Sequence, residues 1–337
     1  GGILYHDGQF DDARLLISLA QTAHDAGACL LNYVAVTDLI RGQDKRVRGV
    51  LARDQESGEE FAIEGRAVIN ATGPFADAIL ALDNPEREPM LATSQGTHLV
   101  LPGEFFPGNT AMIVPKTPDG RVIFVIPWHQ HAIVGTTDTP IPQPMLEPRP
   151  RDDEIQYLLD MSGDYLSRAP TDSDVLGYFT GIRPLVRGDK SSRTASLSRD
   201  HVIRVASSGL ITIAGGKWTT YRKMAEDCVD RAIELHRLKA GTCQTKTLKV
   251  HGATDQPVEP GFRGVYGTDL VAIQQLELEQ PPMAQPLSAD LDITPSLIVW
   301  AVRQEMAWTV DDVLARRTRS LFLNPRAALA IARLLYT

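Results

Sequence analysis

The chain has 337 residues, which is enough for two or three domains. It carries 42 acidic and 34 basic side chains, and this acidic balance argues against a nucleic-acid surface. No apolar run approaches the roughly 20 residues that a bilayer-spanning helix needs. The three cysteines are too scattered for a metal or redox motif, which favours a reducing compartment.

The first 90 residues have the pattern of part of a nucleotide-binding unit. The chain opens with "GGILYHDGQF" and has no initiator Met, so we expect an N-terminal part of the protein to lie outside this sequence. Residues 11–26 predict an amphipathic helix with Leu16 on its apolar stripe. A strand in 29–40, a hairpin and a short strand ending at Asn70 follow. This order is typical of the second half of such a unit.

The rest of the chain changes character twice. Short apolar runs between Pro and Gly turns occupy 93–145 and predict an antiparallel sheet. Residues 152–167 predict a helix, because their first turn is acidic. Residues 244–290 are rich in Pro, Gly and polar side chains, which predicts a linker with short helices. Two further helices are predicted, "PSLIVWAVRQEM" from Pro295 and "TVDDVLARRTRSLFL" from Thr309.

The stretch "GLITIAGGKWTTYRKMAED" places glycines, a cation and two hydroxyls between a strand and a helix. Gly215 and Gly216 allow a ligand to approach the backbone closely. A helix starting near Thr219 offers free N–H groups, and Lys217 adds a positive charge. Together they favour negative charge on a planar or phosphorylated group. The alternative is an ordinary strand-to-helix turn capped by Thr219 or Thr220.

A second turn of this kind follows the strand in "VINATGPFAD", at Ala71, Thr72 and Gly73. Two glycine-containing turns in one chain fit a dinucleotide cofactor better than either turn alone. The chain contains no G-x-G, so the G-x-G-x-x-G pyrophosphate loop is missing. Either the cofactor hypothesis is wrong, or that loop lies in the N-terminal part outside this sequence.

Two arginines and three histidines are candidates for the chemistry. Arg183 in "GIRPLV" and Arg199 in "SLSRDH" suit a phosphate or carboxylate, and a structural salt bridge is the alternative for each. His98 in "SQGTHLVL" is a candidate proton acceptor or a hydrogen-bonded structural histidine. His129 and His131 form an H-x-H without further ligands nearby, so we interpret them as hairpin residues and predict no metal site.

Seven stretches in order, "YHDGQFDDARL", "VINATGPFAD", "GTTDTP", "GIRPLV", "SRDHVI", "GLITIAGGKWTTYRKMAED" and "VRQEMAWTVDDVLARRTRSLFL", resemble one family. It is the FAD-dependent glycerol-3-phosphate dehydrogenases of the aerobic, quinone-linked type. The resemblance implies a mixed α/β fold with a glutathione-reductase-type FAD domain (incomplete here), an antiparallel-sheet substrate domain and a C-terminal helical domain. The implied boundaries are 1–90 with 200–243, then 91–199, and 244–337.

The resemblance also implies roles for single residues. Arg183 and Arg199 match positions that bind the substrate phosphate. His98 and Lys217 would lie near the reacting carbon, His98 as proton acceptor and Lys217 as electrostatic stabiliser. The residues that would contact FAD are Val34, Val36, Ala71, Thr72, Gly73, Gly215, Gly216, Lys217, Trp218, Thr219 and Thr220.

The implied activity is oxidation of sn-glycerol 3-phosphate to dihydroxyacetone phosphate by hydride transfer to FAD, with electrons passed to a membrane quinone. The expected partners are glycerol 3-phosphate, a quinone, a membrane surface and a second copy in a homodimer, at the cytoplasmic face of the membrane. Three alternatives stay open: an oxidase that uses oxygen, a catalytically inert scaffold fragment, and a related amine-oxidising flavoenzyme.

Overall fold

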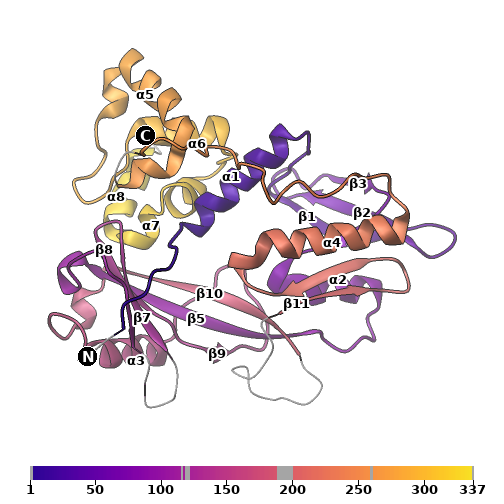
Figure 1. Cartoon of the computed structure of the whole chain (residues 1–337), viewed down its shortest axis with the longest axis horizontal. Helices are drawn as coiled ribbons and strands as arrows, with labels where there is room; N and C mark the ends of the chain where they lie inside the picture. Colours follow the sequence, from indigo (N-terminus) through magenta and orange to yellow (C-terminus); the bar gives the residue numbers. More distant parts are fainter. Residues whose placement is uncertain (1–2, 115–116, 118–121, 188–199, 259–260, 336–337) are drawn as a thin grey trace.

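The structure is a computed structural model of the chain, and it describes residues 3–114, 117, 122–187, 200–258 and 261–335. The mixed α/β class predicted from the sequence is confirmed (Figure 1). Its strands are β1 (Val34–Arg41), β2 (Val47–Asp54), β3 (Glu60–Glu64), β4 (Ile69–Asn70), β5 (Leu91–Pro102), β6 (Met112–Val114), β7 (Ile123–Trp128), β8 (His131–Gly135), β9 (Thr139–Pro140), β10 (Gly177–Val186), β11 (His201–Val205) and β12 (Ile211–Gly215).

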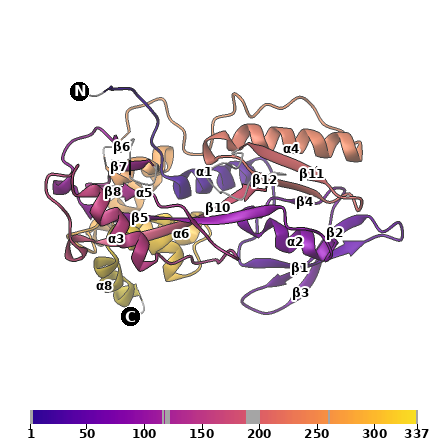
Figure 2. The same ribbon diagram turned by 90° about the horizontal axis from the view of Figure 1, so that it is seen from below.

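Helices lie on both sides of the sheets and gather at the C-terminal end of the chain (Figures 1 and 2). Within the described residues, no helix is both long enough and apolar enough to cross a membrane. The α-helices are α1 (Asp12–Asp25), α2 (Ala76–Asp83), α3 (Asp152–Ser162), α4 (Tyr221–His236), α5 (Leu270–Glu279), α6 (Pro295–Gln304), α7 (Ser320–Leu323) and α8 (Pro325–Leu335).

The largest sheet is the antiparallel one predicted for the middle of the chain. Its strands run in the order β10-β5-β8-β7-β6, and β9 pairs with β5. Helix α3 packs on one face, where Leu99 and Leu101 of β5 join a buried cluster with Leu158. Helix α7 contacts β10, and the other C-terminal helices gather on the same side of the molecule (Figure 1). The hairpin predicted at His129 and His131 is confirmed between β7 and β8.

Two three-stranded sheets make up the nucleotide-binding part. The first is the meander β1-β2-β3. Its first strand, β1, begins at Val34 and not at the predicted residue 29. The second has the order β11-β12-β4, and its central strand β12 runs parallel to β4. Helix α2 packs against both β1 and β12. Strands far apart in the sequence, β4 and β12, therefore end side by side at the same sheet edge.

Helix α1 forms where it was predicted, but Leu16 of its apolar stripe is exposed. Leu16 is 56% exposed, whereas Arg14 is 8% exposed. The Arg14 guanidinium donates to Glu305 at 2.6 Å, so α1 meets the C-terminal helices through a buried ion pair. An amphipathic pattern shows which residues can be buried, and the packing partner decides which of them are.

The helix predicted from Thr309 is interrupted. Its capping box forms, since Asp312 N donates to the Thr309 hydroxyl and Thr309 N donates to the Asp312 carboxylate. Residues Asp312–Arg317 then widen into a π-helical turn, and Arg319 takes a left-handed φ of 58° before α7 begins. The Arg319 guanidinium donates to Asp12 at 2.9 Å. This tertiary contact accompanies a break that local propensity did not predict.

Candidate active site

The "ATG" turn follows β4 and is held by one buried side chain. Asn70 donates from Nδ2 to the Ala76 carbonyl at 3.0 Å and to the Thr212 hydroxyl at 3.3 Å. Its Oδ1 accepts from the Thr72 hydroxyl at 2.7 Å. Gly73 has a φ of 57° with open space where a Cβ would point. Ala71 and Thr72 are exposed, so the turn presents its backbone to a ligand.

The "GGKWTT" turn follows the neighbouring strand β12. Gly215 and Gly216 have φ values of 77° and 75°, and a Cβ on Gly216 would lie 2.4 Å from the Met224 sulfur. The helix predicted to start near Thr219 is present: Trp218–Thr220 form a 3-10 turn, and α4 follows from Tyr221. The Thr220 hydroxyl donates to the Lys217 carbonyl at 3.0 Å, so it closes the turn and makes no side-chain cap on α4.

These two turns fit the cofactor that the sequence predicts. They follow adjacent parallel strands, which is where α/β folds bind nucleotides. Their glycines adopt backbone conformations that side chains rarely take, and Lys217 and Thr219 are exposed beside the start of α4. Ala71 and Thr72 would contact FAD from one turn, and the glycines of the other turn would let it approach the backbone.

Strand β10 passes from these turns into the large sheet and carries Arg183. Arg183 donates to the Thr136 hydroxyl at 3.2 Å and lies 3.4 Å from the Asp138 carboxylate. Its guanidinium lies flat across Gly96 of β5, where a Cβ would be 2.4 Å and 2.6 Å from its two terminal nitrogens. β10 also contacts Gly73–Phe75 and β12. Arg183 therefore lies on the strand that contacts both glycine turns.

His98 lies on the same face of β5 as Gly96. Its ring crosses Gly135 of β8, where a Cβ would be 2.1 Å from His98 Cδ2, and it stacks on Phe179 with ring centroids 4.6 Å apart. Nδ1 is buried and has no hydrogen-bond partner among the residues that the structure describes. Burial, with a smaller contribution from Arg183, lowers the pKa of His98 to about 4. The imidazole is therefore neutral at physiological pH.

Register sets the distance between the histidine and the arginine. In the β5–β10 ladder, Phe179 is opposite His98 and Arg183 is opposite Ser94. Four residues of strand correspond to about 13 Å, and the lean of the guanidinium onto Gly96 reduces the gap to His98 to about 7 Å. That distance is comparable to the length of a small phosphorylated alcohol.

Other predicted site residues lie elsewhere. Val34 and Val36 are in β1 of the meander, and α2 packs between that strand and β12. Trp218 packs against Tyr221, with ring centroids 5.1 Å apart. Arg199 is outside the described residues. The structure therefore places Arg183 and His98 on one sheet face and Arg183 on the strand that contacts both turns, and the adenine-end assignment of Val34 and Val36 stays a prediction.

Several residues of the site were missed by reasoning from the sequence alone. Thr136 and Asp138 hold Arg183, and Phe179 stacks on His98. Ser94 is fully buried opposite Arg183, and its hydroxyl has no partner among the described residues. The motif "GTTDTP" was the available signal for Thr136 and Asp138. The others depend on strand register, which the sequence does not contain.

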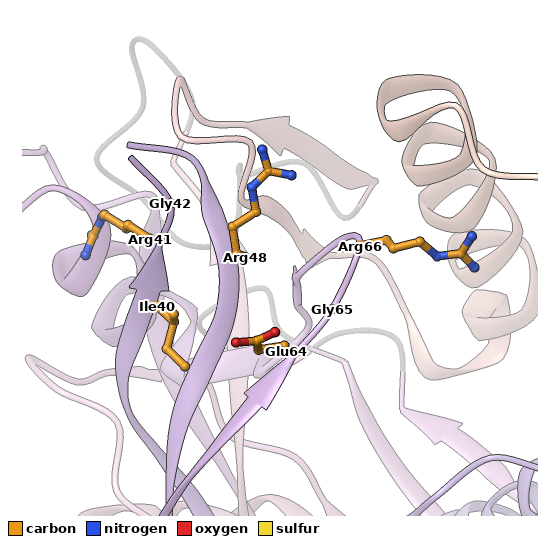
Figure 3. A pocket seen from close by; sticks show the side chains of 7 residues that line it. All are labelled: Ile40, Arg41, Gly42, Arg48, Glu64, Gly65 and Arg66. Carbon is orange, nitrogen blue, oxygen red and sulfur yellow. The ribbon is translucent and has the colours of Figure 1, made fainter. Parts of the chain in front are cut away.

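A cavity of about 560 Å³ lies away from this region, at the ends of the meander strands (Figure 3). Two of the arginines that line it have protein partners: Arg41 donates to the Leu82 carbonyl, and Arg48 pairs with Asp44 at 2.8 Å. In Figure 3 the Arg41 and Arg66 side chains point away from the strands on opposite sides. The cavity shares no residue with the candidate site; its lining is Ile40, Arg41, Gly42, Arg48, Glu64, Gly65 and Arg66.

Comparison with known proteins identifies the family of the chain. The family described as FAD dependent oxidoreductase matches residues 1–222, and the C-terminal domain of alpha-glycerophosphate oxidase matches residues 211–336. The chain is 41% identical to a probable mitochondrial glycerol-3-phosphate dehydrogenase of Caenorhabditis elegans, over 97% of this chain and 48% of that protein. It is 40% identical to the mitochondrial enzyme of Rattus norvegicus, over 97% of this chain and 49% of that protein.

A solved structure gives the same result for the fold. The glycerol-3-phosphate dehydrogenase of Bacillus halodurans, complexed with FAD, has a TM-score of 0.81 and 28% identity, covering 96% of this chain and 68% of that chain. The chain spans about half the length of the two animal relatives. The resemblance found in the sequence motifs is confirmed by these similarities. The chain belongs to the FAD-dependent oxidoreductases.

Proposed function

We propose that the protein containing this chain oxidises sn-glycerol 3-phosphate to dihydroxyacetone phosphate, with FAD as hydride acceptor and a membrane quinone as the final electron acceptor. The observation that carries this proposal is that Arg183 and His98 share one sheet face, and that β10, the strand of Arg183, contacts both glycine turns. The names of the relatives support the choice of substrate.

Arg183 binds the substrate phosphate. Its guanidinium is planar and suits two phosphate oxygens at once, and Thr136 and Asp138 fix its orientation. We also assign Arg199 to the phosphate. Holding the dianion at a fixed distance from His98 turns binding energy into orientation of the reacting C2 carbon.

His98 accepts the proton of the C2 hydroxyl. Its neutral form is the one that can accept, and Gly135 and Phe179 fix the plane of the ring. Burial is the main cause of the low pKa of His98, and the positive charge of Arg183 adds to it. A bound phosphate offsets the charge of Arg183 and so removes that smaller part of the effect, which favours the imidazole as a base. Bound FAD supplies the hydride acceptor, and Lys217 contributes positive charge beside it.

The test is a visible absorption spectrum of the purified full-length protein, before and after adding glycerol 3-phosphate without oxygen. We expect flavin bands that bleach on addition. Bands that persist would contradict the proposed substrate. A flavin-free protein would favour the inert scaffold reading, and bleaching by an amine but not by glycerol 3-phosphate would favour the amine-oxidising alternative.

Oxygen is the second candidate acceptor, because the match over residues 211–336 is to a domain of an oxidase. The two readings separate when the reduced protein is mixed with oxygen or with a soluble ubiquinone analogue. Faster reoxidation by the quinone supports the dehydrogenase. Stoichiometric hydrogen peroxide at a rate that matches turnover supports the oxidase.

A further inference from the structure

The buried carboxylate of Glu154, on α3, is 3% exposed and accepts five hydrogen bonds. Oε2 accepts from Gln95 Nε2 at 2.7 Å, from the Thr97 hydroxyl at 2.8 Å and from Arg151 N at 3.1 Å. Oε1 accepts from the hydroxyls of Thr137 and Thr139 at 2.8 Å and 2.6 Å. Five donors converging on one side chain require a group that only accepts, which is an ionised carboxylate.

The segment 136–139 joins this carboxylate to the candidate site by simple alternation. Thr137 and Thr139 donate to Glu154. Thr136, which precedes Thr137, and Asp138, which lies between the two threonines, contact the Arg183 guanidinium. Every second side chain thus reaches Glu154, and the others reach the arginine. Anything that displaces Thr137 and Thr139 also displaces the two groups that orient Arg183.

A second connection runs through the sheet. The Thr97 hydroxyl donates to Glu154, so its contact with Thr180 at 3.0 Å has Thr180 as the donor. Thr97 N donates to the Thr137 hydroxyl at 2.9 Å. Burial raises the pKa of Glu154. The hydrogen bonds from Thr139, Thr137, Gln95 and Thr97 together lower it by more than burial raises it, so the net pKa is below the ordinary value. The carboxylate is therefore charged at physiological pH.

We propose that Glu154 is a positioning residue for substrate binding: through Thr137 and Thr139 it holds Thr136 and Asp138 in the places that aim Arg183 at the substrate phosphate. This inference rests on the proposed function, in which Arg183 binds that phosphate. A purely structural role would instead make Glu154 an anchor for α3 and β5, with no effect on the affinity of the folded protein for phosphate.

The main experiment is Glu154→Gln in the flavin-loaded full-length protein. Gln keeps the side-chain length and can still cap α3. The Arg151 backbone N–H cannot reverse, so the amide oxygen stays there and the amide NH2 group faces the hydroxyls of Thr137 and Thr139. We expect KM for glycerol 3-phosphate to rise about tenfold or more, with kcat per bound flavin changed less than about threefold.

Two further readouts separate positioning from folding. Calorimetric titration with inorganic phosphate should show a matching loss of affinity without any turnover. The control Asp153→Asn changes the neighbouring carboxylate of the same helix turn, which pairs only with Arg151 among the described residues, and it should leave KM unchanged. A lower Tm with unchanged KM and unchanged phosphate affinity in Glu154→Gln would overturn the proposal.

Milder variants keep the test valid if Glu154→Gln does not fold. Thr139→Val removes one donor from the half-buried end of the network and should raise KM about threefold. In an Asp138→Asn background, Thr139→Val should raise KM by a smaller factor, because both changes act through Arg183. Full additivity of the two changes would contradict the proposal.

The reference is the wild-type protein together with Arg183→Lys. If the wild type neither binds nor oxidises glycerol 3-phosphate, the proposed function fails and Glu154 has no substrate to position. If the wild type is active and Arg183→Lys loses affinity while the Glu154 and Thr139 variants keep it, only the present inference fails.

Discussion

The two faces of strand β5 differ in how their polar side chains are hydrogen-bonded. On one face, here called the site face, Gly96 and His98 lie with Phe179 and Arg183 of β10, and side chains lie flat across glycines. On the other, the α3 face, Gln95 and Thr97 donate to Glu154 of α3. The α3 face satisfies its polar groups within the protein, whereas the site face leaves His98 Nδ1 and the Ser94 hydroxyl without partners among the described residues. A fully satisfied hydrogen-bond network rigidifies a fold, whereas a buried polar group without a partner calls for a functional or structural explanation.

The largest effect should come from Arg183 on the site face. Arg183→Lys keeps the charge but loses the planar fork, and Arg183→Met loses both. We expect kcat/KM for glycerol 3-phosphate to fall about a hundredfold for Lys and about a thousandfold or more for Met. Steady-state kinetics per bound flavin measures this. A Met variant within tenfold of the wild type would remove Arg183 from the phosphate site.

Gly96→Ala tests the space beneath the arginine. The added methyl would lie within 2.6 Å of both terminal nitrogens of Arg183 and of the Thr136 hydroxyl, so the guanidinium must move. We expect a loss of about a hundredfold in kcat/KM, by displacement of the phosphate. Gly181, opposite Gly96 on β10, has open space, so Gly181→Ala is the control for Tm. Equal kinetics for Gly96→Ala and the wild type would show that Arg183 is free to rearrange.

Thr97→Val tests the α3 face, and its effect should appear in stability. Thr97 is fully buried, and its hydroxyl both donates to Glu154 and accepts from Thr180. Its loss should lower the free energy of unfolding by about 1–3 kcal/mol. Denaturant unfolding followed by fluorescence measures the change. An unfolding free energy equal to that of the wild type would mean that the two faces do not differ as described.

The last prediction is a pH dependence carried by His98. Its pKa is about 4 in the folded protein against an ordinary value of 6.5. Between these values the unfolded chain binds the proton and the folded chain does not, so stability falls as pH drops from 6.5 towards 4. Replacing this group in His98→Gln should flatten the curve by at most about 1.4 kcal/mol per pH unit. Unfolding midpoints at pH 4.5, 5.5 and 7 give the comparison, and parallel curves would contradict the assignment.

Short stretches of sequence were enough to predict those features of the candidate site that depend only on neighbouring residues. Both glycine turns, the antiparallel sheet and the candidates Arg183 and His98 follow from short stretches of sequence. Glu154 was seen only as part of an acidic helix start, because its donors come from residues up to 59 positions away. The roles of Gly96 and Gly135 also depend on the register of β5 with β10 and β8. Register is a long-range property, which a single sequence does not state.

Tertiary contacts also explain the failed local predictions. Leu16 has the position of a core residue in the helical pattern, but Arg14 takes the buried place because Glu305 is opposite. The helix from Thr309 is broken where Arg319 reaches Asp12. Both failures occur where α1 meets the C-terminal helices. The domain boundaries predicted from the sequence remain predictions.

The contact of α7 with the sheet has a consequence for dissecting the protein into modules. Phe322 packs on Phe179 with ring centroids 5.5 Å apart, and Phe179 in turn stacks on His98. A Cβ on Gly177 would lie 2.6 Å from the Phe322 carbonyl oxygen, so helix and strand meet without a gap. A fragment ending before residue 309 would leave Phe179, the ring on which His98 stacks, without the Phe322 ring that packs on it. The first 308 residues by themselves therefore lack the helix that backs Phe179, and a design that separates the helical end from the sheet removes this support.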